Sequence, residues 1–391
     1  MIKKIAIAGV AAIATIALMV LLAGAGIVYL ALSDFGLSLG QGARVLGNQR
    51  ANVAAIRDAE GSIGTPDGIA EAGFVEIGGI EQWITIRGRD RRNPVILILH
   101  GGPGNALSQL AYYFRNWERD FTVVQWDQRG AGRTFGRYGT ATRDMTIDRM
   151  VEDGAEVADY ARRRLGQNKI ILLGHSWGSA LGVYLLKRHP ELFSAYVGTG
   201  QIANVADVTA REYDYILARL TADHRRSALA ELHKVGPPPY RTAAQQDVMQ
   251  RWQNRYLVEA DRIYLLSSIG IMLGDAKYSF GDLQRLQAGV VRFSIPSLYS
   301  TMTRIDLNSL GYDMPVPFCI IDGRDDRIAA PDLVTSYFNR IRAPQKAMML
   351  IDKAGHFVMM SNPDEFLNDL VQCIHPLALE GARVSAPSSN K

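Results

Sequence analysis

Short apolar runs alternate with longer amphipathic stretches through the middle of the chain. Val95–Leu99, Thr122–Trp126, Lys169–Leu173 and Phe193–Thr199 are short and mainly apolar, whereas Ile147–Leu165 repeats its apolar positions at helical spacing. Continuous apolar strands are typical of a parallel sheet buried on both faces, and the intervening helices provide the cover. We therefore expect an α/β fold with a mostly parallel central sheet flanked by helices.

A different pattern precedes this region. Phe74–Gly78 and Gln82–Arg87 alternate apolar and polar residues, as strands with one face in the core do, and Gly78-Gly79 provides a turn between them. An antiparallel hairpin is expected here. The buried-strand pattern returns at Val316–Ile321, and one more strand is expected to end at Ile351.

Residues 203–312, between the two groups of strands, have mainly helical periodicity. Val205–Leu220 and Ala243–Leu273 are its long amphipathic stretches, and Gly236–Tyr240 interrupts them with three prolines. A helical block between sheet strands is expected to form a cap that shapes a pocket and excludes water. The expected divisions are a first part of the core at 71–202, the cap at 203–312, a second part of the core at 313–378 and a disordered tail at 379–391.

The first residues differ from the rest in hydropathy. Ile5–Leu32 contains no charged residue, and Lys3 and Lys4 precede it. The run is long enough for a membrane-spanning helix, and lysines on its amino-terminal side favour a cytoplasmic N-terminus. We expect a membrane anchor at 1–32, a juxtamembrane linker at 33–70 and the remaining chain outside the cytoplasm. The alternative is a secreted protein whose signal peptide is cleaved near Ala23–Ala25.

The most informative motif is Gly174-His175-Ser176-Trp177-Gly178, directly after an apolar run and before a helical one. A serine on a tight turn between strand and helix has strained backbone and an exposed hydroxyl. The flanking glycines leave room for neighbouring backbone. Such short patterns also arise by chance, but the strand and helix stand where the chemistry needs them. Ser176 is the expected nucleophile.

A serine needs a base, usually a histidine oriented by a carboxylate. His356 follows the expected strand that ends at Ile351, whereas a surface loop histidine is the alternative interpretation. The acid should precede it in the chain. Asp326, in the loop after Val316–Ile321, is preferred to Asp325, and Asp322 belongs to the strand end. The two rejected aspartates are expected to form turns or solvated loop charges.

The tetrahedral intermediate of acyl transfer needs N–H donors for its oxyanion. The backbone N–H of Trp177 follows from the elbow, and Gly102 in His100–Gly104 is the expected second donor. A glycine-rich loop can also hold phosphate, but no Lys-Ser/Thr follows this one. The loop Asp127–Thr134 is expected to support the pocket through internal charge-assisted hydrogen bonds, with direct substrate contact as the alternative.

Three motifs in this order and spacing resemble the α/β-hydrolase superfamily, and within it the proline iminopeptidase branch of the serine peptidases. They are His100–Gly104, Asp127–Arg133 and Gly174–Ser179, and the resemblance covers roughly residues 70–376. It implies an α/β-hydrolase fold with an inserted helical cap, Ser176 as nucleophile, Asp326 as acid, His356 as base, and Gly102 with Trp177 as the oxyanion hole. The implied activity is the removal of an N-terminal residue, typically proline, from a peptide.

Two features depart from that branch. His175 stands where these peptidases commonly have glycine, and many esterases of the superfamily have Gly-His-Ser. The segment Arg251–Tyr256 lacks the second Trp and the Glu of the cap motif Trp-x-x-Trp-Glu. Glu212, Glu231 and Glu259 are candidate cap residues for binding a substrate ammonium, with exposed helix positions as the alternative interpretation.

Composition adds few constraints. Forty-three basic and 39 acidic residues give a net charge of +4, two of which are Lys3 and Lys4, so nucleic-acid binding is not expected. Cys319 and Cys373 are expected to be buried free thiols. A location outside the cytoplasm would permit a disulfide between them, but the buried setting of Cys319 argues against one. No Cys/His spacing indicates a metal site, and no metal or cofactor is expected.

The sequence therefore predicts a membrane-anchored serine hydrolase, foremost an aminopeptidase of proline iminopeptidase type acting on short peptides. A carboxylesterase or small-amide hydrolase is the second hypothesis. A non-catalytic binding module is a remote third, because such proteins usually lose a triad residue. The expected partners are a small-molecule or short-peptide substrate and, through the N-terminal helix, the membrane; the oligomeric state is not predicted.

Overall fold

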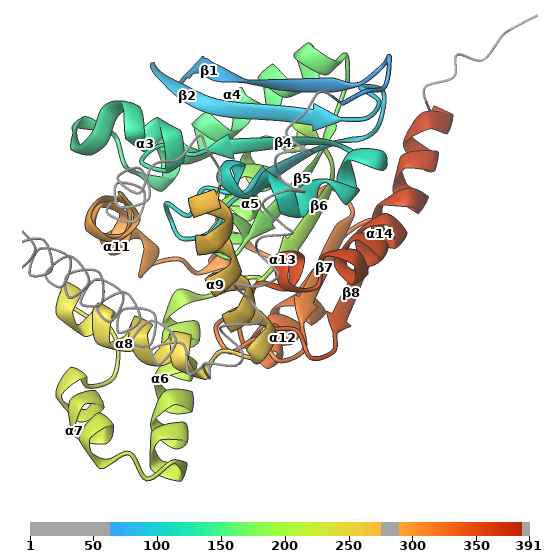
Figure 1. The fold of residues 1–391 in the computed structure, drawn as a ribbon. Helices are drawn as coiled ribbons and strands as arrows, with labels where there is room; N and C mark the ends of the chain where they lie inside the picture. Colours follow the sequence, from blue (N-terminus) through green and yellow to red (C-terminus); the bar gives the residue numbers. More distant parts are fainter. Residues whose placement is uncertain (1–62, 275–288, 385–391) are drawn as a thin grey trace, which may run out of the picture.

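The computed structural model describes residues 63–274 and 289–384. Within these ranges eight strands form one sheet, in the order β1-β2-β4-β3-β5-β6-β7-β8 (Figure 1). They are β1 (Ile69–Ile77), β2 (Ile80–Gly88), β3 (Val95–Leu99), β4 (Thr122–Asp127), β5 (Ile170–His175), β6 (Phe193–Thr199), β7 (Phe318–Gly323) and β8 (Lys346–Ile351). In this spatial order, all neighbouring strands from β4 to β8, including β3, pair in parallel. The predicted mostly parallel α/β sheet is confirmed.

The predicted hairpin is also present. β1 pairs antiparallel with β2, and β2 pairs antiparallel with β4. Gly78 and Gly79 form the turn with φ of 59° and 74°, a conformation that glycine adopts without steric cost. β1 begins at Ile69, just inside the expected linker 33–70, and the linker's residues up to 62 lie outside the described ranges.

Alternate residues of the central strands enter two separate apolar cores. On β3, Leu97 and Leu99 belong to the core that also contains residues of helices α4 (Ile147–Leu165), α5 (Trp177–Arg188) and α12 (Pro331–Arg340). Ile96 and Ile98 belong to the core on the opposite face, with residues of α13 (Val358–Ser361) and α14 (Pro363–Val384). Burial on both faces explains why these strands are continuously apolar in sequence.

Helix α4 has the bounds that its sequence pattern predicts. The Thr146 side chain accepts a hydrogen bond from the Arg149 N–H at the start of the helix. Gly166 ends the helix in the left-handed conformation, with φ of 66°. Both signals are local, so this element could be placed from sequence alone.

Further helices follow β6 and precede β7: α6 (Val205–Ala222), α7 (Arg226–Val235), α8 (Ala243–Tyr256), α9 (Glu259–Gly274) and α11 (Ile295–Met302). Figure 1 shows α6, α7 and α8 as a group away from the sheet, and Ile216, Leu220 and Leu232 belong to their own apolar core. The expected helix Ala243–Leu273 is in fact two helices, because the chain turns at Leu257, where ψ is 154°.

The prediction of two free thiols is wrong. Cys319 on β7 and Cys373 on α14 form a disulfide, with their Cα atoms 6.6 Å apart. α14 crosses the sheet face to which Cys319 points, so the two buried side chains meet. Burial therefore did not argue against pairing, since strand and helix pack directly on each other.

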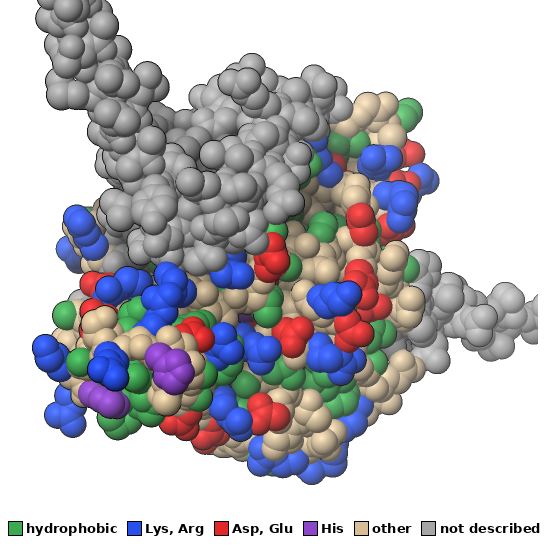
Figure 2. Space-filling model, turned by 60° about the horizontal axis from the view of Figure 1, so that its bottom comes forward, with side chains coloured by type: hydrophobic (Ala, Val, Ile, Leu, Met, Phe, Trp, Pro, Cys, Tyr) green, Lys and Arg blue, Asp and Glu red, His purple; other side chains and the backbone are tan. Residues whose placement is uncertain are grey.

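The predicted membrane anchor at 1–32 lies outside the described residues. Within the ranges 63–274 and 289–384, no helix combines the length and the apolar character that a membrane span needs. At the other end, α14 continues past residue 378 to Val384, so the start of the expected tail is helical. On the face shown in Figure 2, basic and acidic side chains are interspersed.

Candidate active site

Ser176 occupies the turn between β5 and α5. Its backbone has φ of 55° and ψ of −122°, which is rare for a residue with a side chain. A Cβ at Gly178 would collide with the carbonyl of Leu99, and one at Gly174 would lie 2.6 Å from the Cα of Ser179. The two glycines are therefore required for the close packing of the turn, which points the serine away from the strand.

The structure brings Ser176, His356 and Asp326 into one chain of hydrogen bonds. His356 Nε2 lies 2.9 Å from Ser176 Oγ, and His356 Nδ1 lies 2.8 Å from Asp326 Oδ2. The other oxygen of Asp326 accepts the N–H groups of Ile328 and Ala329 at 2.7 and 2.9 Å. Because an ionised carboxylate only accepts, Nδ1 carries the proton and Nε2 can accept from the serine hydroxyl.

His356 lies among several ionisable groups. Burial lowers the pKa of its imidazole, but the charges of Asp326, Asp261 and Asp322 raise it, and the net pKa is above the ordinary 6.5. The ring of His175 lies beside it, with ring centroids 5.1 Å apart. Burial, followed by the charge of His356, lowers the pKa of His175 to about 3, so His175 is neutral at pH 7.

The two other aspartates of the loop have different positions. Asp325 has a side chain 41% exposed and pairs with Arg327 at 3.3 Å, in agreement with a solvated loop charge. Asp322 is not a turn residue or solvated loop charge as expected, because it is fully buried and accepts a hydrogen bond from the Gly200 N–H. Burial, followed by the charge of Asp326, raises the pKa of Asp322 to about 7. Asp322 is therefore part of the buried polar surroundings of the site.

The loop after β3 lies against the serine. A Cβ on Gly101 would lie 3.1 Å from the Cβ of Ser176, and Gly102 has φ of 111°, which favours glycine. Trp177 is the first residue of α5, and the first N–H groups of a helix have no partner within it. The structure thus places the loop that contains Gly102 and the first residue of α5, Trp177, next to Ser176.

Gln128, in the loop Asp127–Thr134, connects this glycine-rich loop to the elbow. Its side-chain amide donates to the His100 carbonyl at 3.1 Å and accepts from Trp177 Nε1 at 3.1 Å. Arg129 of the same loop is buried and pairs with Asp153 on α4 at 2.9 Å. Within the loop, the Asp127 carboxylate accepts the Arg133 N–H at 2.8 Å, as expected. The loop is therefore held both by an internal hydrogen bond and, through Arg129, by a helix of the core.

The three cap glutamates are in different environments. Glu212 lies between Val208 and Ile216 on the buried face of α6 and interacts electrostatically with His356. Burial raises the pKa of Glu212 to about 8, with the His356 charge opposing this rise. Glu231 lies on α7 and accepts from Arg251 and Trp252 Nε1, at 2.9 and 3.1 Å. Glu259 is the first residue of α9. Glu212 is therefore the buried glutamate of the three, whereas Glu231 is half-buried and Glu259 is exposed.

Sequence reasoning missed Asp261 on α9. This side chain is fully buried and accepts the backbone N–H groups of His356 and Phe357, at 2.7 and 3.2 Å. The available signal was the acidic pair Glu259 and Asp261, since acidic residues are enriched in the first turn of a helix. That signal indicates a helix start after Leu257 but not what the carboxylate contacts.

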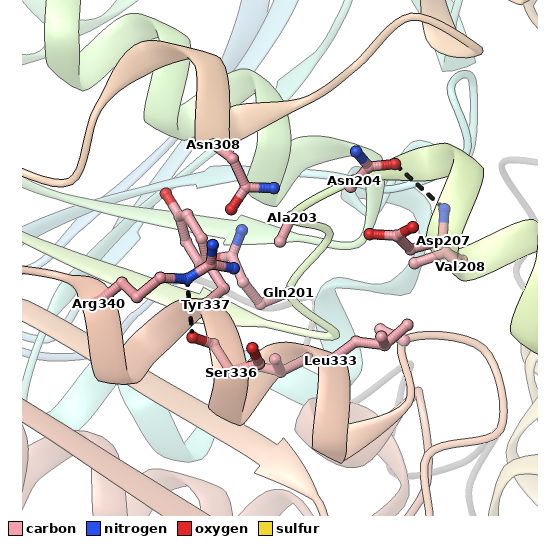
Figure 3. A pocket seen from close by; sticks show the side chains of 12 residues that line it. Gln201, Ala203, Asn204, Asp207, Val208, Asn308, Leu333, Ser336, Tyr337 and Arg340 are labelled. Atoms are coloured by element: carbon pink, nitrogen blue, oxygen red, sulfur yellow. Dashed lines mark hydrogen bonds between the residues drawn. The ribbon is translucent and has the colours of Figure 1, made fainter.

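A small cavity of about 50 Å³ lies between the start of α6 and α12 (Figure 3). Asn204, Asp207, Tyr337 and Arg340 are among its lining residues, and none of the triad side chains lines it. This cavity is therefore separate from the site around Ser176. In the part of the chain that the structure describes, no three His, Cys, Asp or Glu side chains are grouped to hold a metal ion.

Comparison with known proteins agrees with this architecture. Residues 94–363 match the family model for the α/β hydrolase fold. The probable aminopeptidase YbaC of Bacillus subtilis is 30% identical over 305 residues, which are 76% of this chain and 93% of that protein. A probable proline iminopeptidase of Streptomyces coelicolor is 34% identical over 141 residues, covering 33% of this chain and 43% of the relative.

Among solved structures, a proline iminopeptidase-related protein of Thermus thermophilus superimposes with a TM-score of 0.57 at 20% identity. The match covers 79% of this chain and 98% of that one. The chain therefore belongs to the α/β-hydrolase family. It is a hydrolase that resembles the proline iminopeptidases, as the three sequence motifs predicted.

Proposed function

We propose that this hydrolase is a serine aminopeptidase of proline iminopeptidase type, which releases N-terminal residues from short peptides. The hydrogen-bonded series Ser176–His356–Asp326 carries the proposal, since it joins a nucleophile, a base and an orienting acid through contacts of 2.9 and 2.8 Å. The aminopeptidase names of the relatives support the substrate class.

The reaction is acyl transfer. Ser176 Oγ attacks the carbonyl carbon of the N-terminal residue while His356 Nε2 takes the hydroxyl proton. The N–H groups of Gly102 and Trp177 hold the oxyanion, and His356 then gives its proton to the leaving amine. Water attacks the acyl-enzyme by the reverse sequence and releases the free amino acid. The ionised Asp326 stabilises the imidazolium in both halves of the reaction.

Glu212 supplies the specificity for a free amino group. Its carboxyl is buried, and the buried Tyr240 hydroxyl, on which the Glu212 charge acts, has no hydrogen-bond partner within residues 63–274 and 289–384. A buried polar group without a partner is costly, so the Tyr240 hydroxyl beside a buried carboxyl favours a polar ligand. An incoming ammonium would return Glu212 to its ionised form and pair with it.

Glu212→Gln tests this assignment. The substitution removes the charge but keeps the shape, so kcat/KM for proline p-nitroanilide should fall about 10- to 100-fold, mainly through KM. Hydrolysis of an uncharged p-nitrophenyl ester should change little. Glu231→Gln is the matched control, because Arg251 and Trp252 already bind that carboxylate. Equal effects of both variants on the anilide would refute the role of Glu212.

A carboxylesterase or small-amide hydrolase is the second candidate. The observation in its favour is His175, which gives the elbow the Gly-His-Ser form of many esterases. The cap also lacks the second Trp and the Glu of the peptidase motif at Arg251–Tyr256. Such an enzyme would use the same triad, and ester turnover without anilide turnover would identify it.

The proposed location is the outer side of a membrane, with residues 1–32 as an uncleaved anchor. The apolar run Ile5–Leu32 after Lys3 and Lys4 supports this location, as does the Cys319–Cys373 disulfide, since disulfides persist in oxidising compartments. Protease added to intact cells should digest the catalytic domain. Complete protection, with digestion only after lysis, would contradict the proposal.

A further inference from the structure

The backbone of His356 is held from two sides by side chains outside the triad. Its N–H donates to Asp261 Oδ2 at 2.7 Å, and its carbonyl accepts from His175 Nε2 at 3.0 Å. The next N–H, of Phe357, donates to Asp261 Oδ1 at 3.2 Å. His175 comes from the nucleophile elbow, whereas Asp261 comes from α9, among the helices inserted between β6 and β7.

The approach of α9 to this loop depends on Gly355. A Cβ there would collide with Asp261 Oδ2 and would lie 2.6 Å from a methyl group of Val258. Asp261 itself is fully buried, and in the described ranges its hydrogen bonds are those to the two backbone N–H groups. An isolated carboxylate is costly to bury, so a buried one directed at two main-chain donors has a specific use.

We propose that Asp261 is a positioning residue for His356, whose carboxylate fixes the backbone of His356 and Phe357 and so holds the imidazole between Ser176 and Asp326. The inference rests on the proposed function of the triad. It also links the inserted helices to the reaction, because a shift of α9 would move the base relative to the nucleophile. Misplacement of a reacting group by about 1 Å costs about a hundredfold in rate.

The charge of Asp261 acts in the same direction as its hydrogen bonds. Several charged or titratable groups act on His356. Asp322 lies on β7 and Asp326 in the loop after it. The others are Asp261 on α9, Glu212 on α6 and His175 on β5. Loss of the Asp261 charge removes one of the groups that raise the pKa of His356. The imidazole must be neutral to accept the serine proton, so activity is lost as pH falls through that pKa, and the acid limb should move to lower pH without Asp261.

The test is Asp261→Asn in the full-length protein, with Asp325→Asn as the matched removal of a neighbouring exposed charge. Two properties are measured against pH. The first is the pair of constants kcat and KM on proline p-nitroanilide and on a p-nitrophenyl ester, and the second is the His356 ring signal by NMR with labelled histidine. For Asp261→Asn we expect kcat to fall about 10- to 100-fold with little change in KM. The His356 pKa should fall, whereas Asp325→Asn should change neither the kinetic constants nor the His356 pKa.

The outcomes separate the two claims. An unchanged His356 pKa and acid limb in Asp261→Asn would overturn the positioning role, even if the variant were less stable. If the wild type hydrolyses neither substrate, the proposed function fails, and the NMR titration still decides the role of Asp261. If the variant does not fold, the role of Asp261 is tested instead by an NMR titration of the wild-type protein. Its His356 and Phe357 amide signals must shift together near pH 6, where burial places the pKa of Asp261; separate or absent shifts overturn the inference.

Discussion

At the scale of single residues, His356 is where the charges of the site converge. Burial alone would keep the imidazole neutral, but Asp326 in contact and Asp261 and Asp322 farther away raise its pKa. During acyl transfer the imidazole gains a proton, so the same carboxylates stabilise the charge that develops. The surroundings of His356 therefore favour its action as a base that becomes transiently cationic.

Asp326 and Asp325 give a sharp comparison, since they are adjacent in sequence and differ in environment. Asp326→Asn removes the acceptor for His356 Nδ1 and favours the wrong tautomer, so kcat should fall on the order of 10³- to 10⁴-fold. Asp325→Asn should stay within about twofold of wild type, because its exposed carboxylate contacts Arg327. Steady-state kinetics measure both, and a larger loss in Asp325→Asn would reverse the assignment.

Local motifs were sufficient to predict Ser176, His356 and Asp326, because each follows a recognisable strand. Asp261 and the buried position of Asp322 could not be predicted in this way. Their surroundings come from chain segments far away in sequence, as in the contact of Asp261 with the backbone of a residue 95 positions later. Sequence patterns record periodicity and turns, but they do not record which loop a helix terminus will approach.

At the scale of elements, the disulfide joins β7 to α14 close to the site. Cys319 precedes Asp322 on the same strand, and the bridge closes a loop with a sequence separation of 54. A link of this kind restricts the unfolded chain more than it changes the folded one. It should therefore affect stability without affecting the rate of the reaction.

Cys373→Ser tests this expectation. The free energy of unfolding should fall by about 2–4 kcal/mol, with kcat/KM near the wild-type value at about 25 °C. Urea unfolding followed by tryptophan fluorescence gives the stability. Wild type reduced before refolding serves as the control and should match the variant, whereas reductant should leave the variant unchanged. A variant as stable as oxidised wild type would show that the bridge does not contribute.

The division between α8 and α9 shows how tertiary structure overrides a local pattern. Residues 243–273 have continuous helical periodicity, with neither glycine nor proline near Leu257 to signal a break. The break reorients the chain so that α9 contacts α13 and the loop of His356. Packing against the core therefore sets the end of α8, whereas α4, whose cap signals are local, was predicted with its observed bounds.

At the scale of the whole molecule, the sheet places Ser176, Asp326 and His356 at the carboxyl ends of β5, β7 and β8, and the inserted helices place Glu212 and Asp261 near them. Helices cover both faces of the sheet, so its central strands are continuously apolar in sequence. That pattern is what predicted the fold class. The proposed aminopeptidase activity depends above all on Ser176 as the nucleophile.

Release of p-nitroaniline from proline p-nitroanilide by wild type and by Ser176→Ala tests that claim most directly, with a short-chain p-nitrophenyl ester measured alongside. We predict that wild type cleaves the anilide in clear preference to the ester, and that Ser176→Ala loses activity by a factor on the order of 10³ or more. Cleavage of the ester alone, or anilide cleavage that survives in Ser176→Ala, would contradict the claim.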